Sequence, residues 1–124
     1  MINIVFVFVG GGLGSVARYM LSGAVYKWLD SMFPYGTLVV NTIGCFMIGF
    51  VMAGFGDRFM LSPSARIFLT IGLLGGFTTF SSFSFETIAL LRDGELWPAA
   101  LNIAGTLLSC LAATYAGTLI GKSI

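Results

Sequence analysis

The sequence predicts an all-α membrane protein with four transmembrane helices per subunit and a broken third helix, assembled as an antiparallel (dual-topology) homodimer. Its 124 residues are 57% hydrophobic and only 9% charged, whereas a soluble domain carries about a quarter charged residues. Four apolar segments are long enough to cross a bilayer, and most of the charges fall between them. We therefore expect residues 1–124 to form a single transmembrane domain, with helices at about 4–28, 37–55, 65–91 and 96–121.

Composition also excludes several classes of function. A net charge of +1 gives no basic surface for nucleic acid. The chain has no histidine, and Cys45 and Cys110 each stand alone in an apolar run. This leaves no zinc-ligand spacing, disulfide framework or histidine base. Without a carboxylate pair or a nucleophile–base pair, the sequence predicts that the protein is not an enzyme.

The first segment, 4–28, is predicted to be a retained helix and not a cleaved signal peptide, because no basic residues precede it and its apolar pattern continues to Tyr26. Gly10 and Gly14 stand one helical turn apart and suit close contact with another helix. Arg18 lies within this apolar segment. It either attracts anions at a vestibule or extends its side chain to the membrane surface.

The second and fourth segments carry small residues at four-residue spacing, which predicts close helix–helix packing in lipid. Asn41 on the second segment has an amide that can donate to an anion or cap broken backbone. Asn102 and Thr106 on the fourth are expected to hydrogen-bond between helices. The small residues are Cys45, Gly49 and Ala53 on one segment, and Ser109, Ala113, Gly117 and Gly121 on the other.

The third segment, 65–91, is unsuited to one straight helix. At about 1.5 Å per residue it exceeds the hydrocarbon thickness. Adjacent glycines, Gly75 and Gly76, loosen the backbone, and the hydroxyl side chains that follow compete for its hydrogen bonds. We therefore predict a break near Gly75–Thr79, which is tolerated at membrane depth only inside protein or beside a polar cavity. The alternative is a glycine kink filled by neighbouring side chains.

Hydroxyls and phenyl rings alternate directly after this predicted break. Phe80 and Phe83 are three residues apart and project from similar sides of a helix. Because the edge of a phenyl ring is electropositive, two edges beside hydroxyl donors suit a small dehydrated anion, although simple packing explains any single Phe. Glu86 must then be protonated, paired or off the anion's path. The hydroxyl donors are Thr79, Ser81, Ser82 and Ser84.

The positive charges near the helix ends give almost no orientation signal. Topology follows the excess of Lys and Arg in short loops. One side of the membrane would hold Arg58, Arg66 and Lys122, and the other Lys27 and Arg92. Insertion in both orientations permits a two-fold axis in the membrane plane and hence a homodimer of opposed subunits. A single orientation set by other features is the alternative.

Taken together, these residues resemble the Fluc (CrcB) family of fluoride channels over essentially the whole chain. The third-segment motif, residues 75–84, is the most specific part of the resemblance. The family often has Thr where this chain has Ser82, so one hydroxyl replaces another. The first and second segments contribute the similar motifs at 14–18 and 36–41.

The resemblance implies a fluoride-selective channel that exports fluoride passively across a bacterial cell inner membrane and so confers resistance to fluoride toxicity. It implies a dual-topology homodimer in membrane lipid, with a structural sodium ion at its centre held by the backbone carbonyls of Gly75 and Thr78. Phe80 and Phe83 would contact fluoride, with Asn41 beside them. The hydroxyls of Thr79, Ser81, Ser82 and Ser84 would offer successive donors.

A small dual-topology multidrug or cation exporter is the alternative function. Such transporters resemble one another in using a carboxylate on the first helix as the exchange site. Here the first helix carries Arg18, and the membrane carboxylate, Glu86, lies on the third segment. This arrangement gives poor support to a cation exporter.

Overall fold

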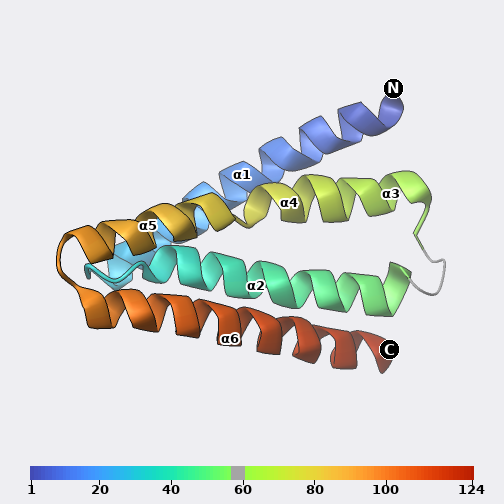
Figure 1. The fold of residues 1–124 in the computed structure, drawn as a ribbon. Coiled ribbons are helices and arrows are strands. Elements are labelled where there is room, and N and C mark those ends of the chain that lie inside the picture. The colour runs from blue at the N-terminus through green and yellow to red at the C-terminus, as the bar shows by residue number, and fades with distance from the viewer. Residues whose placement is uncertain (57–60) are drawn as a thin grey trace.

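The computed structural model describes residues 1–56 and 61–124, which fold into four helical rods (Figure 1). Arg58, counted above in the charge balance, lies outside the described residues. The first rod is α1 (Ile2–Trp28), and the second is α2 (Tyr35–Val51) followed by a wider π-type turn, η1 (Met52–Gly56). The third comprises α3 (Pro63–Ile67), the π-type η2 (Phe68–Leu74), α4 (Gly75–Phe77) and α5 (Phe80–Arg92), and the fourth is α6 (Leu96–Lys122).

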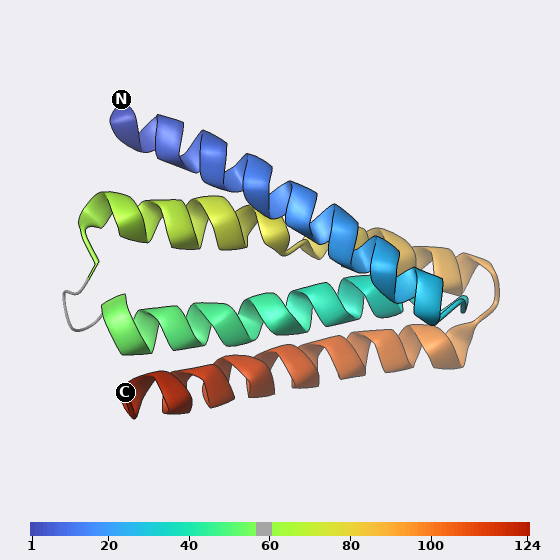
Figure 2. The same ribbon diagram turned by 180° about the vertical axis from the view of Figure 1, so that it is seen from behind.

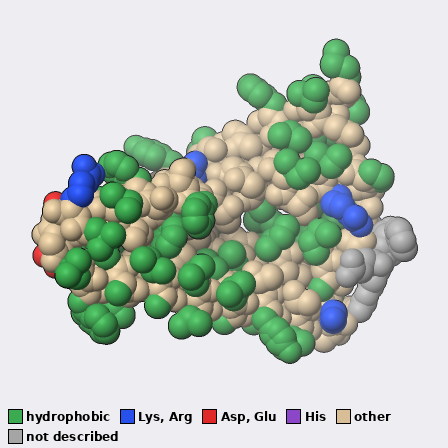
Figure 3. Space-filling view, in the orientation of Figure 1, with side chains coloured by type: hydrophobic (Ala, Val, Ile, Leu, Met, Phe, Trp, Pro, Cys, Tyr) green, Lys and Arg blue, Asp and Glu red, His purple; other side chains and the backbone are tan. Residues whose placement is uncertain are grey.

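Among the residues the structure describes, four helical stretches are long and apolar enough to cross a membrane: Ile2–Trp28, Tyr35–Gly56, Pro63–Arg92 and Leu96–Lys122. They contain the four predicted segments and extend them by at most two residues at either end. Large apolar side chains cover much of the visible surface, and the visible Lys and Arg side chains are few (Figure 3). The chain is thus a multi-pass membrane protein.

The four rods alternate in direction, so both termini lie at the same end of the molecule (Figures 1 and 2). The rods α2 and α6 therefore run parallel, side by side, along their whole length. The first helix packs across η2 and α4, and its N-terminal half then diverges from α2 (Figure 2). This leaves the middle of the third rod between α1 on one side and the α2–α6 pair on the other.

Small residues allow these rods to approach closely, as their spacing predicted. A Cβ atom added at Gly14 would overlap the carbonyl oxygen of Leu73, and one at Gly10 would lie 2.8 Å from that of Phe68. At the other interface, a Cβ at Gly117 would overlap the carbonyl oxygen of Phe46. In lipid, where no hydrophobic force drives helices together, such backbone approach is a main source of packing energy.

Between α4 and α5 the backbone is extended at two residues. Thr78 has φ −89° and ψ 157°, and Thr79 has φ −151° and ψ 117°. The Thr79 side chain then caps α5 by accepting a hydrogen bond from the Ser82 N–H at 3.1 Å. Gly75 and Gly76 are helical; Gly76 serves close packing, because an added Cβ there would lie 2.5 Å from the Gly11 carbonyl oxygen.

Candidate functional site

A hollow of about 370 Å³ opens beside the extended residues Thr78 and Thr79. Its wall is formed by residues of α2, η2, α4, α5 and α6. In the space-filling view, a recess lies between the upper and lower helices (Figure 3). Of the predicted site residues, it brings together Asn41, Gly75, Thr78, Thr79, Phe80 and Phe83. Its surface is mainly apolar with a few polar groups, as is typical of a ligand site.

The amide of Asn41 joins α2 to the extended segment. Its Nδ2 donates to the carbonyl oxygen of Thr79 at 3.0 Å, and its Oδ1 accepts from the N–H of Thr79 at 2.8 Å. Asn41 is buried, with 7% of its surface exposed. The side chain therefore satisfies both backbone groups of a residue that has left the helix, which is the capping role considered for it.

These contacts release two backbone carbonyls from their helical partners. In a continuous helix the N–H of Thr79 would donate to the Gly75 carbonyl, but here it donates to Asn41. Likewise the N–H of Ser82, which would donate to the Thr78 carbonyl, donates to the Thr79 hydroxyl. Gly75 and Thr78, the residues that carry these carbonyls, both line the hollow. The two carbonyls predicted to hold sodium thus lose their ordinary i+4 donors.

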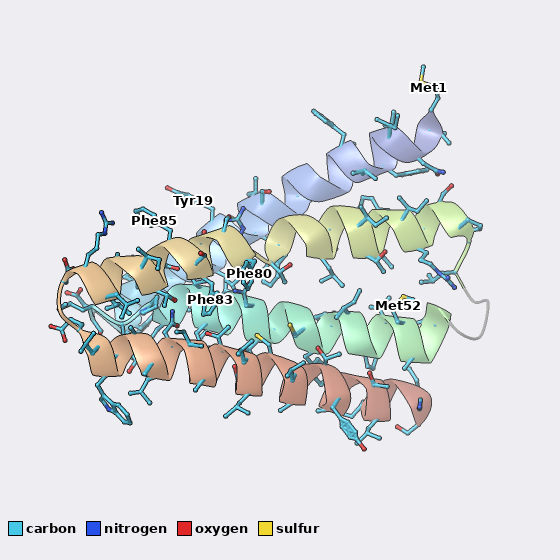
Figure 4. All side chains as sticks on the ribbon, viewed as in Figure 1. Met1, Tyr19, Met52, Phe80, Phe83 and Phe85 are labelled. Atoms are coloured by element: carbon cyan, nitrogen blue, oxygen red, sulfur yellow. The ribbon has the colours of Figure 1, made fainter. Side chains whose placement is uncertain are left out.

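The rings of Phe80 and Phe83 are neighbours in the first turns of α5, with centroids 5.4 Å apart and planes at 52° (Figure 4). Phe83 is 8% exposed and packed against the bundle, whereas Phe80 is 75% exposed. The isolated chain thus fixes one ring by packing and leaves the other open on one side.

The predicted hydroxyl donors separate into two groups. Thr79 lines the hollow, and its hydroxyl lies 3.2 Å from that of Ser81. Ser81 and Ser84 are exposed, Ser82 is half-buried, and none of the three belongs to the wall of the hollow in the single chain. A continuous path through all four hydroxyls therefore remains a prediction.

Arg18 and Glu86 both contact protein groups. Arg18 is half-buried, and its Nε donates to the Gly76 carbonyl at 3.1 Å, one residue before α4 ends. The Oε2 of Glu86 accepts from the Tyr26 hydroxyl at 3.2 Å, while its Oε1 is buried with no hydrogen-bond partner in the described residues. Glu86 faces a separate hollow of about 180 Å³, so it lies apart from the wall that holds Phe80.

A buried hydrogen-bond chain behind Phe83 was only partly expected. Asn102 on α6 donates to the Thr87 hydroxyl at 2.9 Å, and that hydroxyl donates to the Phe83 carbonyl at 2.7 Å. The predicted interhelical role of Asn102 is thus confirmed. Thr106 instead donates at 3.4 Å to Asn102, within the same helix. Thr87, the partner of Asn102, carried no sequence signal, since a lone Thr on an apolar helix usually bonds to its own helix backbone.

Comparison with known proteins matches residues 5–118 to the model of the family described as CrcB-like protein, Camphor Resistance (CrcB). The chain is 49% identical over its whole length to the fluoride-specific ion channel FluC of Geobacter metallireducens, and 46% identical to that of Geobacter sulfurreducens; each relative is also covered completely. It is 45% identical to that of Hydrogenovibrio crunogenus, over 98% of this chain and 92% of the relative. The chain belongs to the CrcB family.

Proposed function

We propose that this protein is a fluoride-selective ion channel that exports fluoride passively. The observation that carries the proposal is full-length identity of 46–49% to two proteins named fluoride-specific ion channels. A channel is not an enzyme, in keeping with the sequence prediction. The exporter alternative gains no support from these relatives.

The chemistry of the hollow supports a small anion as its occupant. The Phe80 and Phe83 rings lie in a tilted pair at its wall, and ring edges carry partial positive charge. The Thr79 hydroxyl lies in the same wall and can donate. Fluoride is the halide that gains most from strong, short hydrogen bonds. A tight, largely apolar site with few donors therefore favours fluoride over larger anions that need more room.

A second copy of the chain, oriented oppositely in the membrane, would complete the site. The ring of Phe80 is 75% exposed, and Ser81 and Ser84 also face outward. Lipid offers a hydroxyl no hydrogen-bond partner, so leaving these side chains facing the bilayer is costly. An antiparallel homodimer would cover these residues and join the hydroxyls into one path. Orientation-specific labelling of engineered termini tests this arrangement, since equal labelling on both sides is expected.

The freed carbonyls of Gly75 and Thr78 fit a structural sodium ion at the centre of such a dimer, since oxygen atoms are the ligands a hard cation prefers. The ion would supply a fixed positive charge and would join the extended segment of one subunit to that of the other. No group of three or more His, Cys, Asp or Glu occurs among the described residues, so backbone oxygens are the fitting donors. Replacing sodium by potassium should lower the melting temperature of the purified dimer.

Export then needs no energy source. Hydrofluoric acid crosses membranes as a neutral molecule and ionises at cytoplasmic pH, so fluoride accumulates inside the cell. A fluoride-selective pore in the bacterial inner membrane lets the anion leave down its gradient. Cells lacking the gene should therefore become sensitive to fluoride and be rescued by this chain.

Flux from proteoliposomes tests the proposed function directly. Vesicles loaded with fluoride and chloride receive valinomycin, so that potassium balances the charge, and ion-selective electrodes follow both anions. We expect rapid fluoride efflux with chloride retained. Equal release of both anions, or release only of an organic cation against protons, would overturn the proposal.

A further inference from the structure

Two thiols lie next to each other at the seam between α2 and α6. Cys45 and Cys110 are both free and half-buried, and both line the hollow described above. The Cys110 thiol lies within electrostatic interaction range of the Cys45 thiol and of the hydroxyls of Thr42 and Ser109. The two cysteines are 65 residues apart in the sequence, and together with Thr42 and Ser109 they form one polar cluster in an apolar wall.

Hydrogen bonds hold the two helices in register around this pair. On one side, the hydroxyls of Thr42 and Ser109 lie 3.1 Å apart. On the other, the Thr114 hydroxyl donates to the Cys45 carbonyl at 3.1 Å. Close backbone approach at Gly49 and Gly117 keeps the same helices together. The two helices that carry the thiols are therefore held in a fixed register.

We propose that Cys45 and Cys110 form a two-thiol binding site for a soft monovalent cation of the Cu⁺ or Ag⁺ class. Soft thiolate ligands select such ions, and d¹⁰ monovalent ions readily accept two ligands in a line. The chain has no histidine, and the described residues offer no third His, Cys, Asp or Glu ligand here. The two thiols therefore do not supply the four ligands of a tetrahedral zinc site.

Binding exchanges protons for the metal without any oxidation. Two thiols lose two protons to solvent, one cation binds, and the resulting dithiolate complex carries one negative charge. The Thr42 and Ser109 hydroxyls beside Cys110 can donate to the new thiolates. Because Phe80 and Asn41 line the same hollow, this charge would repel an anion there. This effect on flux rests on the proposed function, whereas metal binding does not.

Silver binding to the purified protein tests the site. Silver nitrate is titrated in chloride-free buffer, and native mass spectrometry counts bound ions and displaced protons. We expect one silver ion per chain with loss of two protons. Cys45→Ser and Cys110→Ser should each weaken binding at least about tenfold, and the double variant should remove it, which also controls for the six methionines. Unchanged affinity in either single variant, or two independent silver ions per wild-type chain, would overturn the proposal.

Flux measurements separate this proposal from the channel function. Because both cysteines line the hollow, each protein's fluoride flux is compared with its own rate measured without silver. Silver should slow the wild type at least about tenfold relative to its silver-free rate and leave the double variant at its own silver-free rate. Absent fluoride flux in both proteins would refute the channel and leave the silver stoichiometry intact. Equal silver inhibition of both proteins would refute the thiol pair as the inhibitory site.

Discussion

Asn41 and Thr79, 38 residues apart, form a reciprocal pair of hydrogen bonds between side-chain amide and backbone, at 3.0 and 2.8 Å. This geometry uses both functions of the amide, the donor and the acceptor. It allows Thr79 to leave the helix with both of its backbone groups satisfied. The buried amide of α2 is therefore what stabilises the extended segment next to the hollow.

Asn41→Asp is expected to abolish fluoride flux. The carboxylate still accepts from the Thr79 N–H but no longer donates to the Thr79 carbonyl, and it places a negative charge in the wall of the hollow. Loss of one buried donor costs about 1–3 kcal/mol of stability. Efflux from proteoliposomes and the melting temperature of the purified protein measure the two effects.

Asn3→Asp is the matched control, because Asn3 is exposed near the chain start and its Oδ1 accepts a hydrogen bond from the Ser64 hydroxyl at 3.2 Å. An aspartate there keeps that contact, so flux and melting temperature should stay at wild-type values. Normal conduction by Asn41→Asp would show that Asn41 does not border the anion path.

Thr79→Val tests the cap of α5. The substitution keeps the shape but removes the hydroxyl that accepts from the Ser82 N–H. Loss of an N-cap costs about 1 kcal/mol, and the same hydroxyl is a proposed fluoride donor, so both stability and flux should fall. Thr79→Ser retains the cap and should recover most of both. Thermal unfolding and efflux assays make the comparison; equal behaviour of the Val and Ser variants would argue against the hydroxyl's role.

The four helices could be predicted from the sequence because their signals are local. Apolar runs of sufficient length and short charged loops place each helix within two residues of its observed ends. Small residues one turn apart, such as Gly10 and Gly14, also predicted correctly which faces come together. Hydroxyls crowded after two glycines marked the region where the backbone becomes extended, although Thr78 and Thr79, and not the glycines, adopt that conformation.

Long-range pairings were beyond the reach of sequence patterns. The contacts of Tyr26 with Glu86 and of Arg18 with the Gly76 carbonyl join residues about 60 positions apart, and no periodicity links them. Ser81 and Ser84 were predicted as donors together with Thr79 because all three carry hydroxyls, but residue type alone does not tell a cavity-facing side chain from an exposed one. Which residues the proposed second subunit would cover depends on a surface that one chain does not contain.

Gly14→Ala should impair folding or assembly. The new methyl group would overlap the Leu73 carbonyl oxygen, which is backbone and cannot rotate away, so α1 must move off the third rod. Overpacking of this kind costs about 1–3 kcal/mol. Gly12→Ala, two residues away on the same helix, adds its methyl to open space and should be tolerated. The yield of monodisperse protein and the melting temperature compare the two variants. An equal fall of both quantities in both variants would show that the overlap with the Leu73 carbonyl is not the cause.

Phe80→Ile tests whether fluoride conduction needs the aromatic ring edge or only an apolar side chain of similar size at this position. With 75% of Phe80 exposed in the single chain, the substitution leaves the folded subunit nearly unstrained and keeps an apolar side chain. It removes the electropositive ring edge, so fluoride efflux should fall more than about tenfold, a change in barrier above about 1.4 kcal/mol.

Phe8→Ile supplies the control for that loss, because Phe8 is 81% exposed on α1 and does not line the hollow. It should conduct as the wild type does, and both variants should elute at the wild-type size in gel filtration. A Phe80→Ile protein with normal size and normal efflux would show that apolar bulk suffices at this position. The anion would then depend on the hydroxyl and amide donors alone, and Asn41 and Thr79 would become the principal determinants of selectivity.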